Sequence, residues 1–232
     1  MTTPAKKVDL FYLLDFDRCL ASTSKFQLLL ERVVEKQTAI TMAEMHQARQ
    51  DFIGTFDLAS YVRGRLTSMH QDGEERWVRI ESEFVDMALG QDLLEPGAHQ
   101  LLRALDSREL PYGIVTYGGD AWQRAKIAAA GLLYVPHLVT GQKEKGLLIA
   151  DWQRENGYQL PPQLADNVFA QRLVFVDDKP FSFVGLPPDV RGICVTPIED
   201  AMETDVSLLP KNVEVAHGLR EVTRLLFGYS VG

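Results

Sequence analysis

The first clear hydrophobic run in the chain covers residues 10–14, and it leads directly into Asp15-Phe16-Asp17. A short apolar run rich in aromatic residues is typical of a strand that is buried on both faces, such as a central strand of a parallel sheet. Ligands of open parallel sheets bind beyond the carboxyl ends of the strands. Asp15 and Asp17 follow such an end, and alternation along the strand directs both to the same side. A single Asp-x-Asp pair is weak evidence for a site, so its meaning depends on the rest of the chain.

Residues 22–92 show the periodicity of amphipathic helices. Apolar stripes at helical spacing predict four helices, which lie near residues 26–33, 42–52, 58–69 and 77–87. Thr41 and Glu44 form a capping box at the start of the second helix. Residues 5–95 contain no proline, which favours continuous helices. We therefore expect an α-helical module inserted directly after the first strand.

From Pro96 onward, short apolar strands alternate with helices. Strands are predicted at residues 112–116, 134–139, 173–176 and 192–195, and helices at 97–105, 120–130 and 147–154. A last helix is predicted with Val215, Leu219, Val222 and Leu226 on one face. This alternation predicts an α/β fold with a doubly wound parallel sheet. The expected domains are an α/β core from residues 1–21 and 93–232 and an α-helical cap from residues 22–92.

Polar residues follow or flank several of the predicted strand ends. They are Asp15 and Asp17, Thr116, a lysine at position 143 or 145, and Asp177 and Asp178. If all of them lie at one edge of the sheet, four carboxylates share a small crevice. Like charges about 4 Å apart repel by roughly 4 kcal/mol per pair at an effective dielectric constant near 20, so this cluster requires a cation. Carboxylates without neighbouring His or Cys favour Mg²⁺, and a lysine and a threonine hydroxyl suit the oxygens of a phosphoryl group.

The motifs, in this order, resemble the four motifs of the haloacid dehalogenase-like (HAD) hydrolase superfamily. Motif one of that family is an apolar strand ending in Asp-x-Asp, motif two is a strand ending in Ser or Thr, motif three supplies a lysine, and motif four is a strand ending in paired acids. The matching segments here are Leu13-Leu14-Asp15-Phe16-Asp17, Ile114-Val115-Thr116, Lys143 or Lys145, and Phe175-Val176-Asp177-Asp178. The resemblance spans residue 8 to about residue 200, and the predicted insertion lies where the family has its helical cap.

The resemblance implies a Mg²⁺-dependent phosphatase that hydrolyses a small phosphorylated metabolite. Asp15 would be the nucleophile that forms an aspartyl-phosphate, and Asp17 would be the general acid and then the general base. Mg²⁺ would be held by the carboxylates of Asp15 and Asp178 and by the backbone carbonyl of Asp17, with Asp177 acting through water or a neighbouring ligand. The phosphate oxygens would contact Thr116, Tyr117, Gly118 and Lys145.

The sequence departs from the family pattern at two places. Arg18-Cys19 follows motif one, where the family usually has Gly-Thr or Gly-Val. Arg18 could reach the substrate phosphate or the leaving group, or it could point to solvent, and Cys19 is interpreted as a small buried hydrophobe. The motif-three lysine lacks its usual following proline. We prefer Lys145 to Lys143 because Lys145 directly precedes the helix that leads toward motif four.

Composition limits the possible partners and locations. The net charge of −8 without a basic block argues against binding to nucleic acid. No signal peptide and no apolar stretch approaching the ~20 residues of a membrane span is visible. Two cysteines, Cys19 and Cys194, suit a reducing compartment. We therefore expect a cytoplasmic protein that binds a small phosphorylated substrate, without nucleic acid or membrane partners.

Other functions compatible with these motifs differ in what they require. A two-component receiver domain has the same residue types, but its acid pair comes before the phosphorylated Asp, which is the reverse of the order found here. A dehalogenase needs neither Mg²⁺ nor an acid two residues after its nucleophile, so Asp17 and the later acid pair favour a phosphatase. A phosphotransferase or phosphomutase of the same superfamily, and a non-catalytic HAD-like binding protein, stay open as alternatives. Specificity is expected to lie in the helical insertion.

Overall fold

The computed structural model describes residues 5–52, 56–196 and 205–228. The chain divides into two compact units. One unit is formed by Met1–Ala21, Leu94–Gln123 and Leu133–Gly232, and the other by Ser22–Leu93 and Arg124–Leu132. The sequence had assigned residues 124–132 to the α/β core, whereas the structure groups them with the inserted helices. Local periodicity identifies this stretch as helical but cannot show with which residues it packs.

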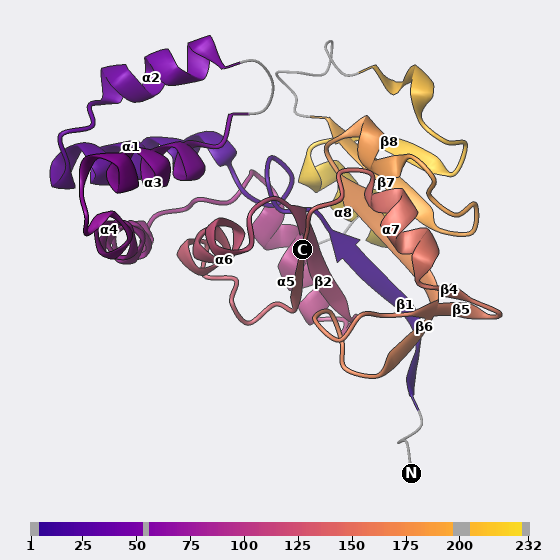
Figure 1. Cartoon of the computed structure of the whole chain (residues 1–232). Coiled ribbons are helices and arrows are strands. Elements are labelled where there is room, and N and C mark those ends of the chain that lie inside the picture. Colours follow the sequence, from indigo (N-terminus) through magenta and orange to yellow (C-terminus); the bar gives the residue numbers. More distant parts are fainter. Residues whose placement is uncertain (1–4, 53–55, 197–204, 229–232) are drawn as a thin grey trace. The chain divides into compact units, whose positions relative to one another are not determined.

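The α/β unit is built on a sheet whose six main strands are all parallel, in the order β3-β2-β1-β6-β7-β8 (Figure 1). Their bounds are Lys6–Leu14 (β1), Tyr112–Tyr117 (β2), His137–Thr140 (β3), Val168–Asp177 (β6), Arg191–Thr196 (β7) and Val213–His217 (β8). The predicted α/β class with a parallel sheet is confirmed. A short hairpin of β4 (Gln153–Arg154) and β5 (Gly157–Gln159) adds an antiparallel edge along the first half of β6, and the sequence did not indicate it.

Helices cover both faces of this sheet because successive side chains of each buried strand point to opposite sides. On one face, Phe11 and Leu13 of β1 share a buried cluster with Ile149 of α7 (Lys145–Asp151). On the other face, the ring of Tyr12 packs 6.1 Å from that of Phe227, centroid to centroid, in α8 (Leu219–Phe227). Helix α8 packs in turn against α5 (Ala98–Asp106). Helix α6 (Asp120–Ala129) follows β2, and the short 3₁₀ helices η1 (Pro180–Phe183) and η2 (Val206–Leu208) complete the elements.

The end of the chain differs from the prediction. Val215 was assigned to the last helix, but it lies in β8, and α8 begins only at Leu219. The residues 213–215 alternate Val-Glu-Val, which suits a strand, and Gly218 with φ +80° separates the strand from the helix. Leu219 and Val222 are buried in α8 as the apolar stripe predicted. The predicted last helix therefore began about one turn before the observed start of α8 at Leu219.

The second unit contains the inserted helices, and its core is formed by their apolar stripes. The helices are α1 (Thr23–Gln37), α2 (Met42–Asp51), α3 (Leu58–Met69) and α4 (Gly73–Ala88). Phe26 and Phe84 are fully buried, with ring centroids 6.1 Å apart. The Thr41 side chain accepts a hydrogen bond of 3.1 Å from the Glu44 N–H, as the capping box predicts.

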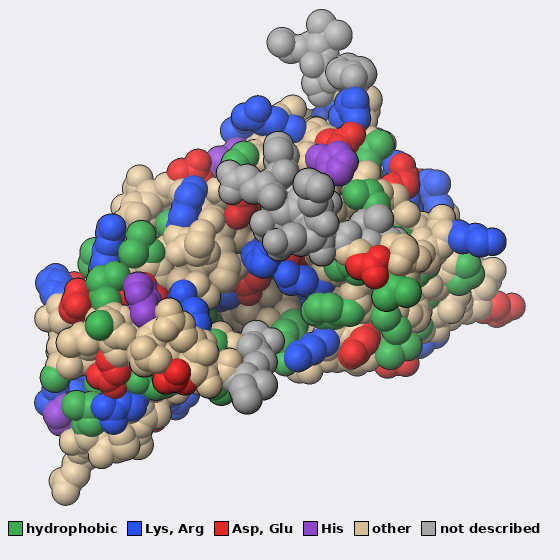
Figure 2. All heavy atoms as spheres, turned by 90° about the horizontal axis from the view of Figure 1, so that it is seen from above, with side chains coloured by type: hydrophobic (Ala, Val, Ile, Leu, Met, Phe, Trp, Pro, Cys, Tyr) green, Lys and Arg blue, Asp and Glu red, His purple; other side chains and the backbone are tan. Residues whose placement is uncertain are grey.

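Acidic and basic side chains are interspersed on the surface seen in Figure 2, in keeping with the absence of a basic block in the sequence. Of the helices in residues 5–52, 56–196 and 205–228, none is long and apolar enough to cross a membrane.

Candidate active site

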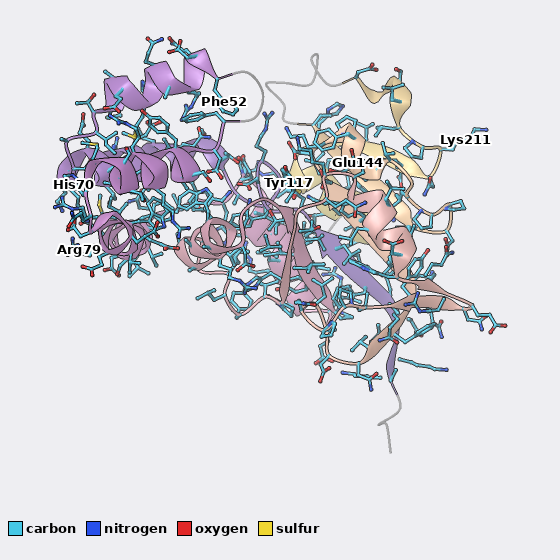
Figure 3. All side chains as sticks on the ribbon, viewed as in Figure 1. Phe52, His70, Arg79, Tyr117, Glu144 and Lys211 are labelled. Atoms are coloured by element: carbon cyan, nitrogen blue, oxygen red, sulfur yellow. The ribbon has the colours of Figure 1, made fainter. Side chains whose placement is uncertain are left out.

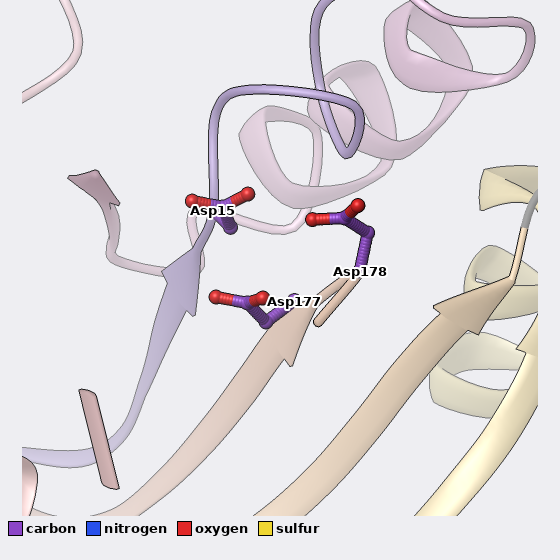
Figure 4. Close-up of side chains that lie close together, drawn as sticks. All are labelled: Asp15, Asp177 and Asp178. Carbon is purple, nitrogen blue, oxygen red and sulfur yellow. The ribbon is translucent and has the colours of Figure 1, made fainter. Parts of the chain in front are cut away.

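Three buried carboxylates meet at the carboxyl ends of β1 and β6. These strands pair in parallel with Leu14 beside Val176, and the Asp15 N–H donates a hydrogen bond of 2.8 Å to the Val176 carbonyl. The next residues on both strands are therefore brought together. Asp15, Asp177 and Asp178 each offer a carboxylate oxygen, and these atoms all lie within 4.8 Å of one another (Figure 4). At most 5% of each residue is exposed, so water screens their mutual repulsion poorly.

Lys145 supplies an internal positive charge to this cluster. It is the first residue of α7, and its ammonium donates hydrogen bonds to Asp15 Oδ1 and, at 2.7 Å, to Asp177 Oδ2. Burial lowers the pKa of Lys145, but the carboxylates of Asp15 and Asp177 more than offset this effect, so its pKa is raised and the side chain stays charged. The alternative candidate, Lys143, is exposed, and its ammonium lies 5.5 Å from the centre of the Tyr117 ring. The lysine that contacts the carboxylate cluster is Lys145.

Asp178 combines two cationic partners with one unused oxygen. Its Oδ2 lies 2.9 Å from Lys179 Nζ and 3.4 Å from Arg18 Nε. Its Oδ1 is buried and has no hydrogen-bond partner in the described part of the chain. Burial raises the pKa of Asp178 to about 6, although Lys179 and Arg18 lower it. A buried carboxylate oxygen without a donor is costly, so Oδ1 needs a ligand.

This donor set fits Mg²⁺. The cluster offers several hard carboxylate oxygens, and one of them, the buried Asp178 Oδ1, has no donor in the described part of the chain and could bind a small cation. Burial also raises the pKa of Asp15 well above its usual range, with Asp177 and Asp178 adding to the effect and Lys145 opposing it. A bound cation would favour the ionised form of this carboxyl group.

Thr116 is the last residue but one of the neighbouring strand β2 and has a buried hydroxyl. The residue has no exposed surface, and its Oγ1 has no hydrogen-bond partner among the described residues. Tyr117, labelled in Figure 3, is the last residue of β2, and Glu144 immediately precedes α7. The Gly118 N–H donates a hydrogen bond of 3.1 Å to the Thr140 carbonyl. An unpartnered hydroxyl at a strand end remains suited to a phosphate oxygen.

Asp17 occupies a different position from the other acids. Its side chain is half-buried and is not part of the three-carboxylate group, so three rather than four carboxylates cluster in the described residues. Asp17 Oδ2 accepts a hydrogen bond of 2.9 Å from Gln123 Nε2, and the same nitrogen donates to the Tyr117 carbonyl at 2.7 Å. Gln123 is not among the site residues that the sequence motifs predict. The only local signal was a polar residue in the first turn of the helix after motif two, which does not reveal that it is buried.

The two residues that depart from the family motif have clear positions. Arg18 has a left-handed backbone with φ +61°, a conformation that glycine adopts more readily. Its side chain is 46% exposed and its Nε lies 3.4 Å from Asp178 Oδ2, so it is held at the carboxylate cluster and does not point only to solvent. Cys19 is buried, and burial raises the pKa of its thiol, which fits its interpretation as a small hydrophobe.

The fold is that of HAD-like hydrolases. A protein from Burkholderia xenovorans described as a haloacid dehalogenase-like hydrolase superposes with a TM-score of 0.61 and 19% identity, over 94% of this chain and 96% of that one. A HAD-hydrolase from Bacillus subtilis bound to magnesium superposes with a TM-score of 0.53 and 14% sequence identity, over 96% of this chain and 100% of that one. A protein from Thermotoga maritima described as a β-phosphoglucomutase superposes with a TM-score of 0.52 and 14% sequence identity, over 94% of this chain and 98% of that one. No protein-family model and no curated protein sequence matches the chain.

Proposed function

We propose that this chain, which has the HAD-like hydrolase fold, is a Mg²⁺-dependent phosphatase that acts on a small phosphomonoester. The observation that carries the proposal is the buried group Asp15, Asp177 and Asp178, with Lys145 bonded to two of its members and Asp178 Oδ1 without a donor. Site chemistry rather than fold supports the reaction class, since one fold hosts many activities. The magnesium bound to the Bacillus subtilis neighbour agrees with this choice of cation.

In the first half-reaction, a carboxylate oxygen of Asp15 attacks phosphorus and the bond from phosphorus to the leaving oxygen breaks. Asp17 gives its proton to that leaving oxygen, so the alcohol departs neutral and Asp15 carries an aspartyl-phosphate. In the second half-reaction, Asp17 takes a proton from water, whose oxygen attacks phosphorus. The bond to Asp15 then breaks and inorganic phosphate is released.

The remaining residues of the site bind and orient the phosphoryl group. The Thr116 hydroxyl and the Lys145 ammonium would donate to phosphate oxygens, and Arg18 lies at the same sheet edge through its contact with Asp178. Asp15 and Asp178, together with the Asp17 carbonyl, would hold Mg²⁺, which supplies electrostatic stabilisation of the transferring phosphoryl group. The helical insertion would select the substrate.

The test is to trap the phosphorylated enzyme. Wild type, Asp15→Asn and Asp17→Asn are mixed with p-nitrophenyl phosphate and Mg²⁺, quenched in acid and measured by intact mass. Asp15→Asn should acquire no phosphate and lose turnover. Asp17→Asn should accumulate phosphate that hydroxylamine removes, because the activated leaving group needs little protonation but water still needs a base.

Two controls accompany this measurement. Asp151→Asn changes an exposed acid at the end of α7 and should behave as wild type. Excess chelator should abolish turnover, and Ca²⁺ should not restore it, because its larger and looser coordination misplaces the attacking oxygen. Full activity in chelator, or phosphate on Asp17, would contradict the proposal.

A further inference from the structure

We propose that Gln123 is a positioning residue that orients the carboxyl group of Asp17 for proton transfer. This inference rests on the proposed phosphatase function. Gln123 is the fourth residue of α6 and only 4% of it is exposed. Its side chain nevertheless points to the end of β2 and to the loop after β1, where the proposed acid–base residue lies.

The two hydrogen bonds of Gln123 fix the orientation of its amide. Nε2 carries two N–H donors, and both have acceptors: Asp17 Oδ2 at 2.9 Å and the Tyr117 carbonyl at 2.7 Å. Rotation of the amide by half a turn would place Oε1 against these two oxygens, which are acceptors as well. The donor face of the amide is therefore directed at Asp17.

The backbone around β2 leaves room for this arrangement. Gly118 has φ +147°, and a Cβ atom at this position would lie 2.5 Å from Gln123 Nε2. The Gln123 N–H donates at 3.0 Å to the Gly119 carbonyl, which ties the first turn of α6 to the Gly118-Gly119 segment. The absence of a side chain at Gly118 thus leaves space for the Gln123 amide.

The hydrogen bonds described for the Gln123 side chain are accepted by Asp17 and by the Tyr117 carbonyl. Its Oε1 is buried and has no partner in the described part of the chain. A glutamine used only to satisfy a buried region would be expected to engage both ends of its amide. Here the engaged end of the amide donates to Oδ2 of Asp17 and so holds this carboxyl group in one orientation.

The consequence for catalysis depends on the leaving group. Misplacing a catalytic group by about 1 Å can cost about 10²-fold in rate. A leaving oxygen that is weakly basic, as in p-nitrophenyl phosphate, needs little help from the acid, whereas the oxygen of phenyl phosphate needs more. Loss of Gln123 should therefore slow the two substrates unequally, while a general loss of structure would slow them equally.

The experiment measures single-turnover formation of the phosphoenzyme from both substrates in wild type and in Gln123→Met, which keeps the side-chain length but removes the donors. The rate with phenyl phosphate should fall about 10²-fold, the rate with p-nitrophenyl phosphate should fall less than about tenfold, and KM should change little. Gln159→Met is the matched control, because Gln159 Nε2 donates at 3.1 Å to the Val168 carbonyl elsewhere in the sheet. It should leave the ratio of the two rates unchanged.

A double-mutant cycle tests whether Gln123 acts through its hydrogen bond to Asp17 or through its hydrogen bond to the Tyr117 carbonyl. In an Asp17→Asn background, Gln123→Met should cause little further loss with phenyl phosphate, because residues that act as one unit are not additive. Equal slowing of both substrates, or an additive loss in the double variant, would overturn the inference. If Gln123→Met does not fold, Gln123→Asn, whose amide is one methylene too short to reach Asp17, carries the same test. A wild-type chain that forms no phosphoenzyme would instead refute the proposed function.

Discussion

Replacing Lys145 by Met tests whether this residue balances the buried carboxylates. Lys145 is 3% exposed and bonds to Asp15 and Asp177, which are 4% and 0% exposed. The gross attraction to Asp177 at 2.7 Å is about 6 kcal/mol at an effective dielectric constant near 20, and desolvation offsets much of it. Removing one partner of a buried ion pair nevertheless costs about 3–5 kcal/mol, because the other charges stay buried and unpaired.

The assay is thermal unfolding with and without Mg²⁺. For a chain of 232 residues, about 3–5 kcal/mol corresponds to a fall in Tm of about 6–20 °C without Mg²⁺. Mg²⁺ binds the native cluster and should raise the Tm of the variant more than that of wild type, since it replaces the missing positive charge. Turnover should be lost, because the ammonium that contacts Asp15 is absent.

Lys143→Met is the matched control, two residues away. Lys143 is exposed and interacts with the Tyr117 ring at 5.5 Å, a contact worth about 0.5–1 kcal/mol. The Tm of Lys143→Met should be at most about 4 °C below that of wild type, and turnover should persist. Melting of Lys145→Met within about 2 °C of wild type without Mg²⁺, or loss of activity in Lys143→Met, would refute this role of Lys145.

Three further predictions follow from the site. Because burial raises the pKa of Asp178 to about 6 and also raises the pKa of Asp15, protons should compete with Mg²⁺ for these carboxylates. Calorimetric titrations should therefore show the apparent Kd rising as the pH falls below 6, by at least about tenfold per pH unit. Thr116→Val removes a buried hydroxyl without a partner in the described chain. It should leave Tm nearly unchanged but lower kcat/KM about 10- to 100-fold, the loss of a hydrogen bond to charged phosphate. Arg18→Gly removes the strain of a left-handed backbone, which costs about 1–2 kcal/mol with a non-glycine residue. It also removes a half-exposed ion pair that contributes about 0–1 kcal/mol. Its Tm should therefore equal or exceed that of wild type, and a lower Tm would show that the Arg18 side chain contributes more than this.

The sequence alone determined the inserted helices, the strands that end at the site, and the edge of the sheet that carries polar residues. Apolar runs that end in Asp15, Thr116 and Asp177 predict parallel strands, and parallel strands place their carboxyl ends at one edge. The helices of residues 22–92 followed from local periodicity and from the Thr41 cap. These features depend on residues close together in the chain, so a local pattern is sufficient to predict them.

Only the tertiary structure decided which polar side chains meet. The local pattern favours Lys145 over Lys143 only by its place before a helix, whereas the fold brings Lys145 into contact with Asp15, which lies 130 residues earlier. Gln123 is likewise 106 residues from Asp17, and nothing near it in the chain marks it as buried. Val215 could have continued a helix, but pairing with Cys194 of β7 makes it part of a strand. In each case contacts between distant segments select one of several locally acceptable positions, because packing outweighs the small differences in local propensity.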